Sequence, residues 1–163
     1  MGIDETVARD EITQLCYRYA WALDSRDLDS LVACFVPGAV THDFWDESLH
    51  NVGVTVLMVG NVLIDLDGPD TAHGVVSCLA RVEDPPGSGR IIEQAIVYFD
   101  RYRRDDPGVW RFASRRHELF WGVEAAECPL DQPDAHWPAS STGRGTLPYR
   151  LETWRHFWSP GTG

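Results

Sequence analysis

The chain has 163 residues, and 44% of them are hydrophobic, which fits one globular domain with a substantial core. The formal net charge of -11 would repel phosphate backbones, and acidic residues are interspersed among the arginines so that no basic stripe forms; we therefore expect no nucleic-acid partner. All 14 basic residues are arginine, which excludes Schiff-base chemistry and pyridoxal phosphate attached through a lysine of this chain. An uncharged or weakly charged ligand fits this composition best.

The N-terminal residues carry charge from the fourth position onward, and no later run approaches the length of a membrane span. We therefore expect a cytoplasmic protein with no membrane partner. The cysteines are widely spaced and form no CxxC pair, so they predict small buried side chains and not disulfides or a zinc site. The six histidines show no ligand spacing on one element, and no metal is expected. The cysteines are Cys16, Cys34, Cys78 and Cys128.

The first predicted element is an amphipathic helix from about Asp4 to Leu23, where apolar residues recur at helical spacing. Asp27 is typical of an N-cap, and it predicts a short second helix over residues 28–35 that ends before Pro37 and Gly38. Two helices are thus expected to pack together early in the chain.

The pattern then changes to short strands, predicted over residues 39–45, 55–66, 71–83, 91–104 and 109–121 and separated by turn sequences rich in Asp, Pro and Gly. Helices followed by hairpin-linked strands indicate an α+β fold, with helices on one face of an antiparallel sheet. We expect residues 1–122 to form this domain. Residues 123–163 would be an extension, partly helical near 149–158, that covers the pocket or contacts another subunit.

Three stretches, YAWALDSRDLDSLVACF, LMVGNVLIDLDGPDTAHG and RYRRDDPGVWRFASRR, resemble the SnoaL-like, scytalone dehydratase-like branch of the NTF2-like superfamily. The resemblance covers about residues 8–122. It implies a cone in which a strongly curved, mostly antiparallel sheet wraps on N-terminal helices around a hydrophobic pocket. It also implies an enzyme that needs no cofactor and dehydrates, isomerises or cyclises a hydrophobic ring compound.

Asp24 falls on the pocket aspartate of that family, in the sequence LDSRD after the first helix. An apolar pocket would raise the pKa of this carboxyl and make it a usable base. The alternative is a solvated helix-end residue that precedes the Asp27 cap.

The proton-transfer histidines of the family are absent. The position of the first is Leu57, and the ungapped position of the second is Val82. His73 imitates the motif, but the next strand of the family already accounts for it, so we expect it to face away from the pocket. The two-histidine chemistry therefore does not transfer to this chain.

On the last predicted strand, alternation places Arg115, His117 and Leu119 on one face, and the register of the family turns that face inward. An inward His117 could pair with Asp24 as an acid/base partner. The alternative is a partly exposed histidine near an oligomer surface. Arg115 could hold Asp24 ionised or polarise a substrate carbonyl.

The resemblance places the side chain of Tyr98 in the pocket, where its hydroxyl could donate to a substrate oxygen, as could that of Tyr19 if it does not simply pack in the core. It also implies that His42 or Asp43 points inward, in a register that the sequence leaves open. The family carries a lid helix of two or three turns before residue 55, and we expect this chain to have room there for little more than one turn. The further pocket positions that the resemblance implies are Leu57, Val59, Asn61, Val82 and Leu119.

These residues favour a lyase, isomerase or cyclase that acts on a polyketide-like or steroid-like ring, with Asp24 as base, His117 as its partner, and Arg115 or Tyr98 stabilising an enolate. The loss of both histidines motivates the alternative, a non-catalytic small-molecule-binding or accessory protein, including one with a role like an oxygenase small subunit. A homo-oligomer, dimer or trimer, is expected in either case.

Overall fold

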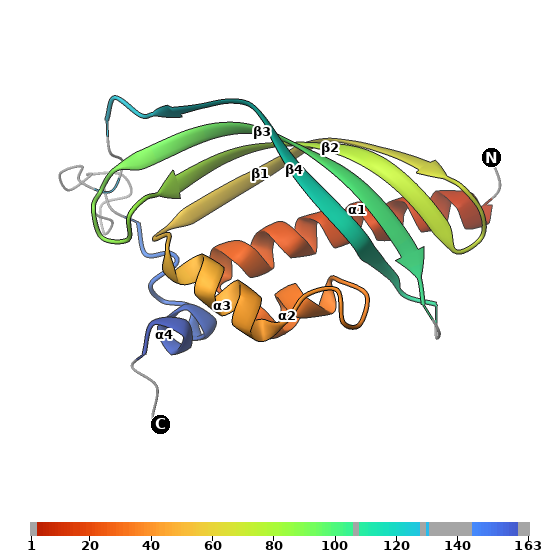
Figure 1. Ribbon diagram of the computed structural model, residues 1–163, viewed down its shortest axis with the longest axis horizontal. Coiled ribbons are helices and arrows are strands. Elements are labelled where there is room, and N and C mark those ends of the chain that lie inside the picture. Colours follow the sequence, from red (N-terminus) through yellow and green to blue (C-terminus); the bar gives the residue numbers. More distant parts are fainter. Residues whose placement is uncertain (1–2, 106–107, 128–129, 131–144, 160–163) are drawn as a thin grey trace.

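The computed structural model describes residues 3–105, 108–127, 130 and 145–159. Its helices α1 (Ile3–Ser25), α2 (Leu28–Ala33) and α3 (His42–His50) precede four strands, and α4 (Glu152–Trp158) follows them. The strands are β1 (Thr55–Leu66), β2 (Thr71–Glu83), β3 (Ile91–Arg104) and β4 (Trp110–Glu124), paired antiparallel in the order β1-β2-β3-β4. The sheet arches over α1, with α2 and α3 below it (Figure 1). The α+β prediction is confirmed.

Helix α1 lies in the hollow of the sheet and buries one side. Ile12, Cys16 and Tyr19, spaced three and four residues apart, are buried, whereas Trp21 on another side is exposed. The helix ends at Ser25, and the side chain of Asp27 accepts a hydrogen bond from the Ser30 N–H, as expected of the predicted N-cap of α2. The two predicted helices are thus present, joined by a tight corner.

Alternation along the strands sorts their side chains between a face toward the helices and an outer face. On β2 the inward side chains are small and buried, and Gly74 is required there because a Cβ would lie 2.6 Å from the Leu63 carbonyl oxygen. Register shifts interrupt the ladders, and such irregularities bend strands. The rows that cross the inner face are Val59–Cys78–Ile96–Leu119, Val62–Val76–Tyr98–His117 and Ile64–Gly74–Asp100–Arg115.

The strand predicted over residues 39–45 is wrong, because helix α3 begins there. The side chain of Thr41 accepts a hydrogen bond of 3.2 Å from the Phe44 N–H, so this threonine is an N-cap. Asp43 in the first turn and His50 in the last turn both suit the helix dipole. The expectation of a missing lid helix is also wrong, since α3 has nine residues and lies below the arch of the sheet (Figure 1).

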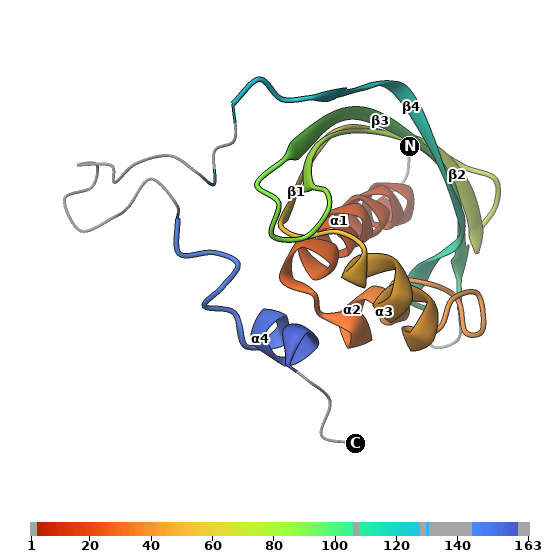
Figure 2. The ribbon, with the colours of Figure 1, turned by 60° about the vertical axis from the view of Figure 1, so that its left-hand side comes forward.

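Helix α4 lies within residues 149–158, and it packs where α1 and α3 end (Figure 2). The hydroxyl of Thr153 donates a hydrogen bond of 2.8 Å to the Ser25 carbonyl oxygen. The ring of Phe157 stacks on that of His50, with centroids 4.1 Å apart. This part of the extension therefore covers its own chain. The expectation of a buried Cys128 concerns a residue outside the described ranges.

We expect Phe112→Ala to lower the free energy of unfolding by about 3–5 kcal/mol, because the side chain is fully buried and its removal leaves a cavity. Phe120 on the same strand is 78% exposed, so Phe120→Ala is a matched control that should change stability by about 0.5 kcal/mol or less. Urea denaturation of both variants measures the difference. Equal losses would contradict the assignment of the core.

Candidate active site

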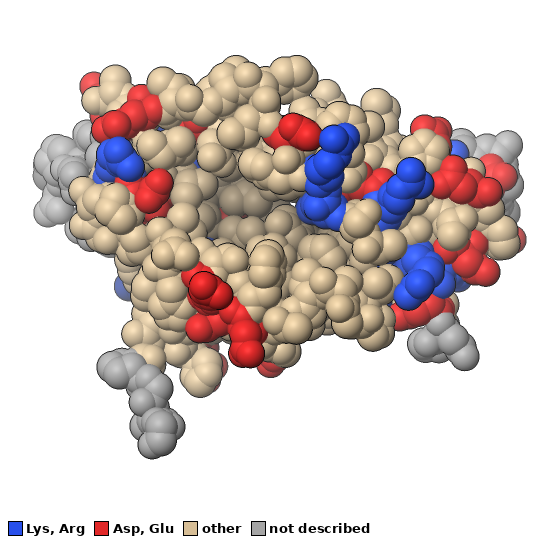
Figure 3. Space-filling view, viewed as in Figure 1, with Lys and Arg blue, Asp and Glu red and all other residues tan. Residues whose placement is uncertain are grey.

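The molecule is hollowed between the arch of the sheet and the helices (Figure 3). Some apolar side chains on the inner face of β1 and β2 are only partly buried, although they pack against the core. Leu57, Val59 and Val82, which the resemblance placed in a pocket, are among them. Two charged groups, a carboxylate held by β1 and an ion pair between β3 and β4, interrupt this apolar interior.

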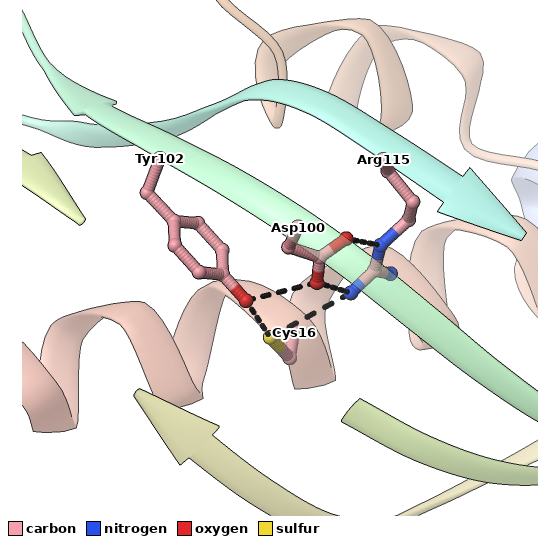
Figure 4. Close-up of polar contacts among 4 residues, drawn as sticks. All are labelled: Cys16, Asp100, Tyr102 and Arg115. Carbon is pink, nitrogen blue, oxygen red and sulfur yellow. Dashed lines mark hydrogen bonds and ion pairs between the residues drawn. The ribbon is translucent and has the colours of Figure 1, made fainter. Parts of the chain in front are cut away.

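The ion pair joins Asp100 on β3 to Arg115 on β4, which face each other in the same row (Figure 4). The Nε of Arg115 donates to Oδ1 at 2.8 Å, and Nη2 donates to Oδ2 at 2.7 Å. The Tyr102 hydroxyl donates to Oδ2 at 2.8 Å. The side chains of Arg115 and Asp100 are only 4% and 0% exposed, so each charge depends on the other for its stabilisation.

The guanidinium of Arg115 is enclosed by three aromatic rings. Its central carbon lies 4.4 Å from the Tyr19 ring centroid and 4.1 Å from those of Tyr98 and Phe112. Burial alone would lower the pKa of Arg115, but the hydrogen bonds and charge of Asp100 outweigh burial and raise it. The guanidinium is therefore charged at neutral pH.

The third nitrogen of Arg115 is not used by Asp100. Its Nη1 is buried and has no hydrogen-bond partner among the residues that the structure describes. Burial raises the pKa of Tyr98 and raises that of Tyr19 to about 12, so both phenols are protonated at neutral pH and able to donate. This region can therefore stabilise negative charge on an oxygen atom.

Asp24, in the last turn of α1, is bonded to the first strand and not to α2. Its Oδ1 accepts from the Thr55 hydroxyl and its Oδ2 accepts from the Leu57 N–H, both at 2.9 Å. Burial raises the pKa of Asp24 to about 6, against the effect of these hydrogen bonds and of the charge on Arg26. A carboxyl with this pKa can exchange a proton near neutral pH.

The charges of Asp24 and Arg115 both affect a third group in the interior, the Cys78 thiol. Burial raises the pKa of Cys78, on the inner face of β2, to about 11, and both charges influence it: that of Arg115 lowers the pKa and that of Asp24 raises it. Cys78 therefore lies within the electrostatic reach of both groups. Cys16 is also buried, with its Sγ 3.6 Å from the Tyr102 hydroxyl.

The structure does not bring His117 to Asp24. No hydrogen bond or ion pair joins them in the part of the chain that is described. His117 lies in the row of Tyr98, whereas Leu57, which binds Asp24, lies in the row of Gln94. Four residues along β3 correspond to roughly 13 Å. His117 lies in an inner row, its ring centroid 5.6 Å from that of Tyr98, but the residue is exposed to solvent. Partial burial lowers its pKa.

The expectation that His42 or Asp43 points inward is wrong, because both residues begin α3 instead of lying on a strand. Both side chains are exposed. The Nε2 of His42 lies 2.7 Å from a carboxylate oxygen of Asp29 on α2, so this histidine links two helices outside the sheet.

Asn61 is exposed at the register shift of β1, and Leu119 lies in an inner row but is about half exposed. His73 faces away from the interior, as expected, and its Nδ1 lies 2.8 Å from an oxygen of Asp67. No group of three or more His, Cys, Asp or Glu side chains in the described ranges is arranged to hold a metal ion. No helix within those ranges is long and apolar enough to cross a membrane.

The sequence contains a pattern that indicates an inward Asp100. Residues 98, 100 and 102 share one face of a strand, so an inward Tyr98 implies an inward Asp100 and Tyr102. A carboxylate on a buried face requires a partner, and Arg115 on the next strand was already expected to face inward. No comparable signal in the sequence marks Arg26 as a buried residue, because its position depends on a backbone conformation with positive φ.

The model of the SnoaL-like domain family matches residues 4–42 and 41–116, and the chain belongs to that family. Among solved structures, a candidate scytalone dehydratase from Novosphingobium aromaticivorans is 21% identical, with a TM-score of 0.66 over 77% of this chain and 92% of that one. The hexachlorocyclohexane dehydrochlorinase LinA-type3 from Novosphingobium barchaimii is 17% identical, with a TM-score of 0.65 over 76% and 94%. These likenesses show the NTF2-like fold. A search of curated proteins finds no match.

The raised pKa of Asp24 makes stability depend on pH. The folded state binds a proton more tightly than the unfolded state, whose Asp pKa is near 3.8, so this stabilisation is complete below pH 3.8 and is lost as pH rises through about 6. The shift of about two units corresponds to about 3 kcal/mol.

We therefore expect Asp24→Asn to remove about 2 kcal/mol of the change in unfolding free energy between pH 4 and pH 7. Urea denaturation at a series of pH values measures it. Asp43→Asn, which alters an exposed carboxylate on α3, should retain the pH dependence of the parent protein. An unaltered profile in Asp24→Asn would contradict the buried, shifted carboxyl.

Proposed function

We propose that the protein is a cofactor-independent enzyme that performs acid/base chemistry on a hydrophobic ring substrate of polyketide-like or steroid-like type. The observation that carries this proposal is the state of Asp24, a largely buried carboxylate with a pKa of about 6 and with both oxygens fixed by donors from β1. A base in this state is largely ionised at pH 7 yet can hold a proton transiently.

In the proposed reaction, a C–H bond that is conjugated with a carbonyl through the ring system breaks. The proton passes to Asp24, and the electron pair moves to the carbonyl oxygen as an enolate. The free Nη1 of Arg115 or the hydroxyl of Tyr98 donates a hydrogen bond to that oxygen. Returning the proton to another carbon gives an isomerase, whereas loss of a leaving group gives a lyase. His117 would serve as a second acid/base group.

The rival proposal is a non-catalytic ligand-binding or accessory protein, including a role like that of an oxygenase small subunit. Leu57 favours it, because an aliphatic side chain stands where the family resemblance implies a proton-transfer histidine. Only the main-chain N–H of Leu57 contacts Asp24. A binding cone can tolerate this replacement, whereas an enzyme must perform proton transfer with other groups.

We expect Asp24→Asn to slow proton transfer by about a hundred- to ten-thousand-fold, because the variant keeps the shape but loses the base. The measurement is NMR-detected deuterium exchange at carbons conjugated with the carbonyl in a panel of fused-ring enones. Asp43→Asn controls for loss of surface charge and should keep the parent rate. Saturable binding of these compounds without exchange in the parent protein would instead support the binding protein.

We also propose that the outer face of the sheet binds a second copy of this chain. One row across all four strands, Met58–Leu79–Ala95–Trp121, lies on that face, and its large side chains are 66%, 57% and 49% exposed. No described element covers the row. An apolar row of this extent on an otherwise strongly charged protein is typical of an interface.

Charge favours a like copy as the occupant. The outer face carries the ion pairs Arg81–Glu93 and Arg116–Glu118, one on either side of the apolar row, so these charges cancel. A chain with a net charge of -11 repels its copy least where the local charge is neutral. A twofold axis through the row would also place each pair against the other pair of the partner copy.

We expect the parent protein to exceed the 18.3 kDa of one chain in light scattering, and Leu79→Arg to return it to a monomer by placing a charge in the row. Val7→Arg, at an exposed position of α1, is a matched control that should keep the parent assembly. A monomeric parent protein at tens of micromolar, or a Leu79→Arg variant that stays associated, would overturn this interface.

A further inference from the structure

Arg26 ties the end of α1 to the beginning of β1. It adopts a positive φ of 58°, and the residue is almost fully buried. Its Nη1 donates to the Leu23 carbonyl oxygen at 2.5 Å and to the Thr55 hydroxyl at 3.0 Å. Its Nη2 donates to the carbonyl oxygens of Val52 and Gly53. One guanidinium thus fixes the corner at which the helix passes next to the first strand.

Helix α4 closes over this guanidinium. The central carbon of Arg26 lies 4.8 Å from the Trp154 ring centroid and 5.8 Å from that of Phe157. Both rings are buried. The hydroxyl of Thr153 binds the carbonyl oxygen of Ser25, the residue directly before Arg26. The C-terminal helix therefore supplies the apolar wall that keeps the guanidinium in place and away from water.

The Thr55 hydroxyl connects this corner to the carboxylate. It accepts a hydrogen bond from Nη1 of Arg26 and donates one to Oδ1 of Asp24 at 2.9 Å. A hydroxyl has a single proton, so a cation bound on its acceptor side directs that proton toward the carboxylate. The Leu57 N–H fixes the other oxygen of Asp24.

We propose that the C-terminal helix positions Asp24 through Trp154, Arg26 and Thr55. This inference goes beyond the proposed function but depends on it in one respect, that Asp24 is the proton acceptor. It gives α4 a task distinct from covering a pocket: it holds a cation whose hydrogen bond orients the base. Trp154, Arg26 and Thr55 are positioning residues, since none of them need touch the substrate.

The charged and titratable groups around Asp24 determine the direction in which its pKa should move when Arg26 is disturbed. Arg26 on its own segment lowers the pKa of Asp24, as do the hydrogen bonds from Leu57 and Thr55 on β1, while Cys78 faces it from β2. Burial lowers the pKa of Arg26 to about 10, so it is still a cation at pH 7. No hydrogen bond or ion pair links α4 to Asp24 in the described ranges. A substitution of Trp154 that keeps the hydrogen bond from Thr153 to Ser25 should therefore reach Asp24 through Arg26.

The test is the pKa of the Asp24 carboxyl, measured by carbon-13 NMR titration and assigned with Asp24→Asn. Trp154→Ala removes the ring over Arg26, so the cation gains access to water and its hold on Thr55 weakens. We expect an upward shift on the order of one pKa unit. Trp154→Phe, which restores an aromatic ring, should return most of the shift.

Trp158→Ala is the matched control, because Trp158 is the same residue type on the same helix. Its ring contacts those of His50, Trp154 and Phe157, but within the described ranges it does not lie over the Arg26 guanidinium. It should leave the Asp24 pKa unchanged. Equal shifts in both variants, or none in Trp154→Ala, would overturn the proposal. Thr55→Val removes the hydroxyl that connects Arg26 to Asp24 without altering α4, so it should also raise the pKa of Asp24. An unchanged Asp24 pKa in this variant would likewise contradict the proposal.

These titrations need no substrate. A failure of the proposed enzyme activity would leave the connection from α4 to Asp24 intact, and a failure of the connection would leave Asp24 free to act as a base. The two proposals are therefore tested separately.

Discussion

The interior of this protein depends on the pair between Asp100 and Arg115. Two charges buried on neighbouring strands are tolerable only when each satisfies the other, and the two parallel hydrogen bonds between them allow little deviation from one geometry. The pair therefore favours one register between β3 and β4. It also fixes the plane of the guanidinium among three rings, so that two of its nitrogens face Asp100 and the third is left for another acceptor.

A second consequence concerns the distance between the two candidate groups. Arg115 touches Cys16 on α1, whereas Asp24 lies eight residues further along the same helix, which corresponds to about 12 Å of helix axis. The oxygen-stabilising donor and the proton acceptor thus lie toward opposite ends of the interior. A ligand that engages both must be extended, and an enolate formed at Asp24 can reach Arg115 only through a conjugated ring system. This geometry suits fused rings better than small ketones.

The sequence predicted the regular parts well, because alternation along β1, β2 and β3 and the Asp27 cap are local signals. It failed where a local signal was ambiguous or a contact was distant. Residues 39–45 contain apolar side chains that fit a short strand, but the Thr41 cap starts α3 instead. The pairing of Asp24 with His117 required knowing which rows of the sheet they occupy, and register shifts that no local pattern marks alter those rows.

The replacement of a histidine by Leu57 changes what the proposed chemistry can be. The main-chain N–H of Leu57 now holds Asp24, so the carboxylate is oriented by groups that cannot themselves give or take a proton during the reaction. A lone carboxylate can remove a proton and return it elsewhere, which is enough for isomerisation. Dehydration also needs an acid at the leaving group, and the nearest histidine on the inner face is in a distant row. Within the proposed class, the geometry therefore favours proton shuttling over elimination of water.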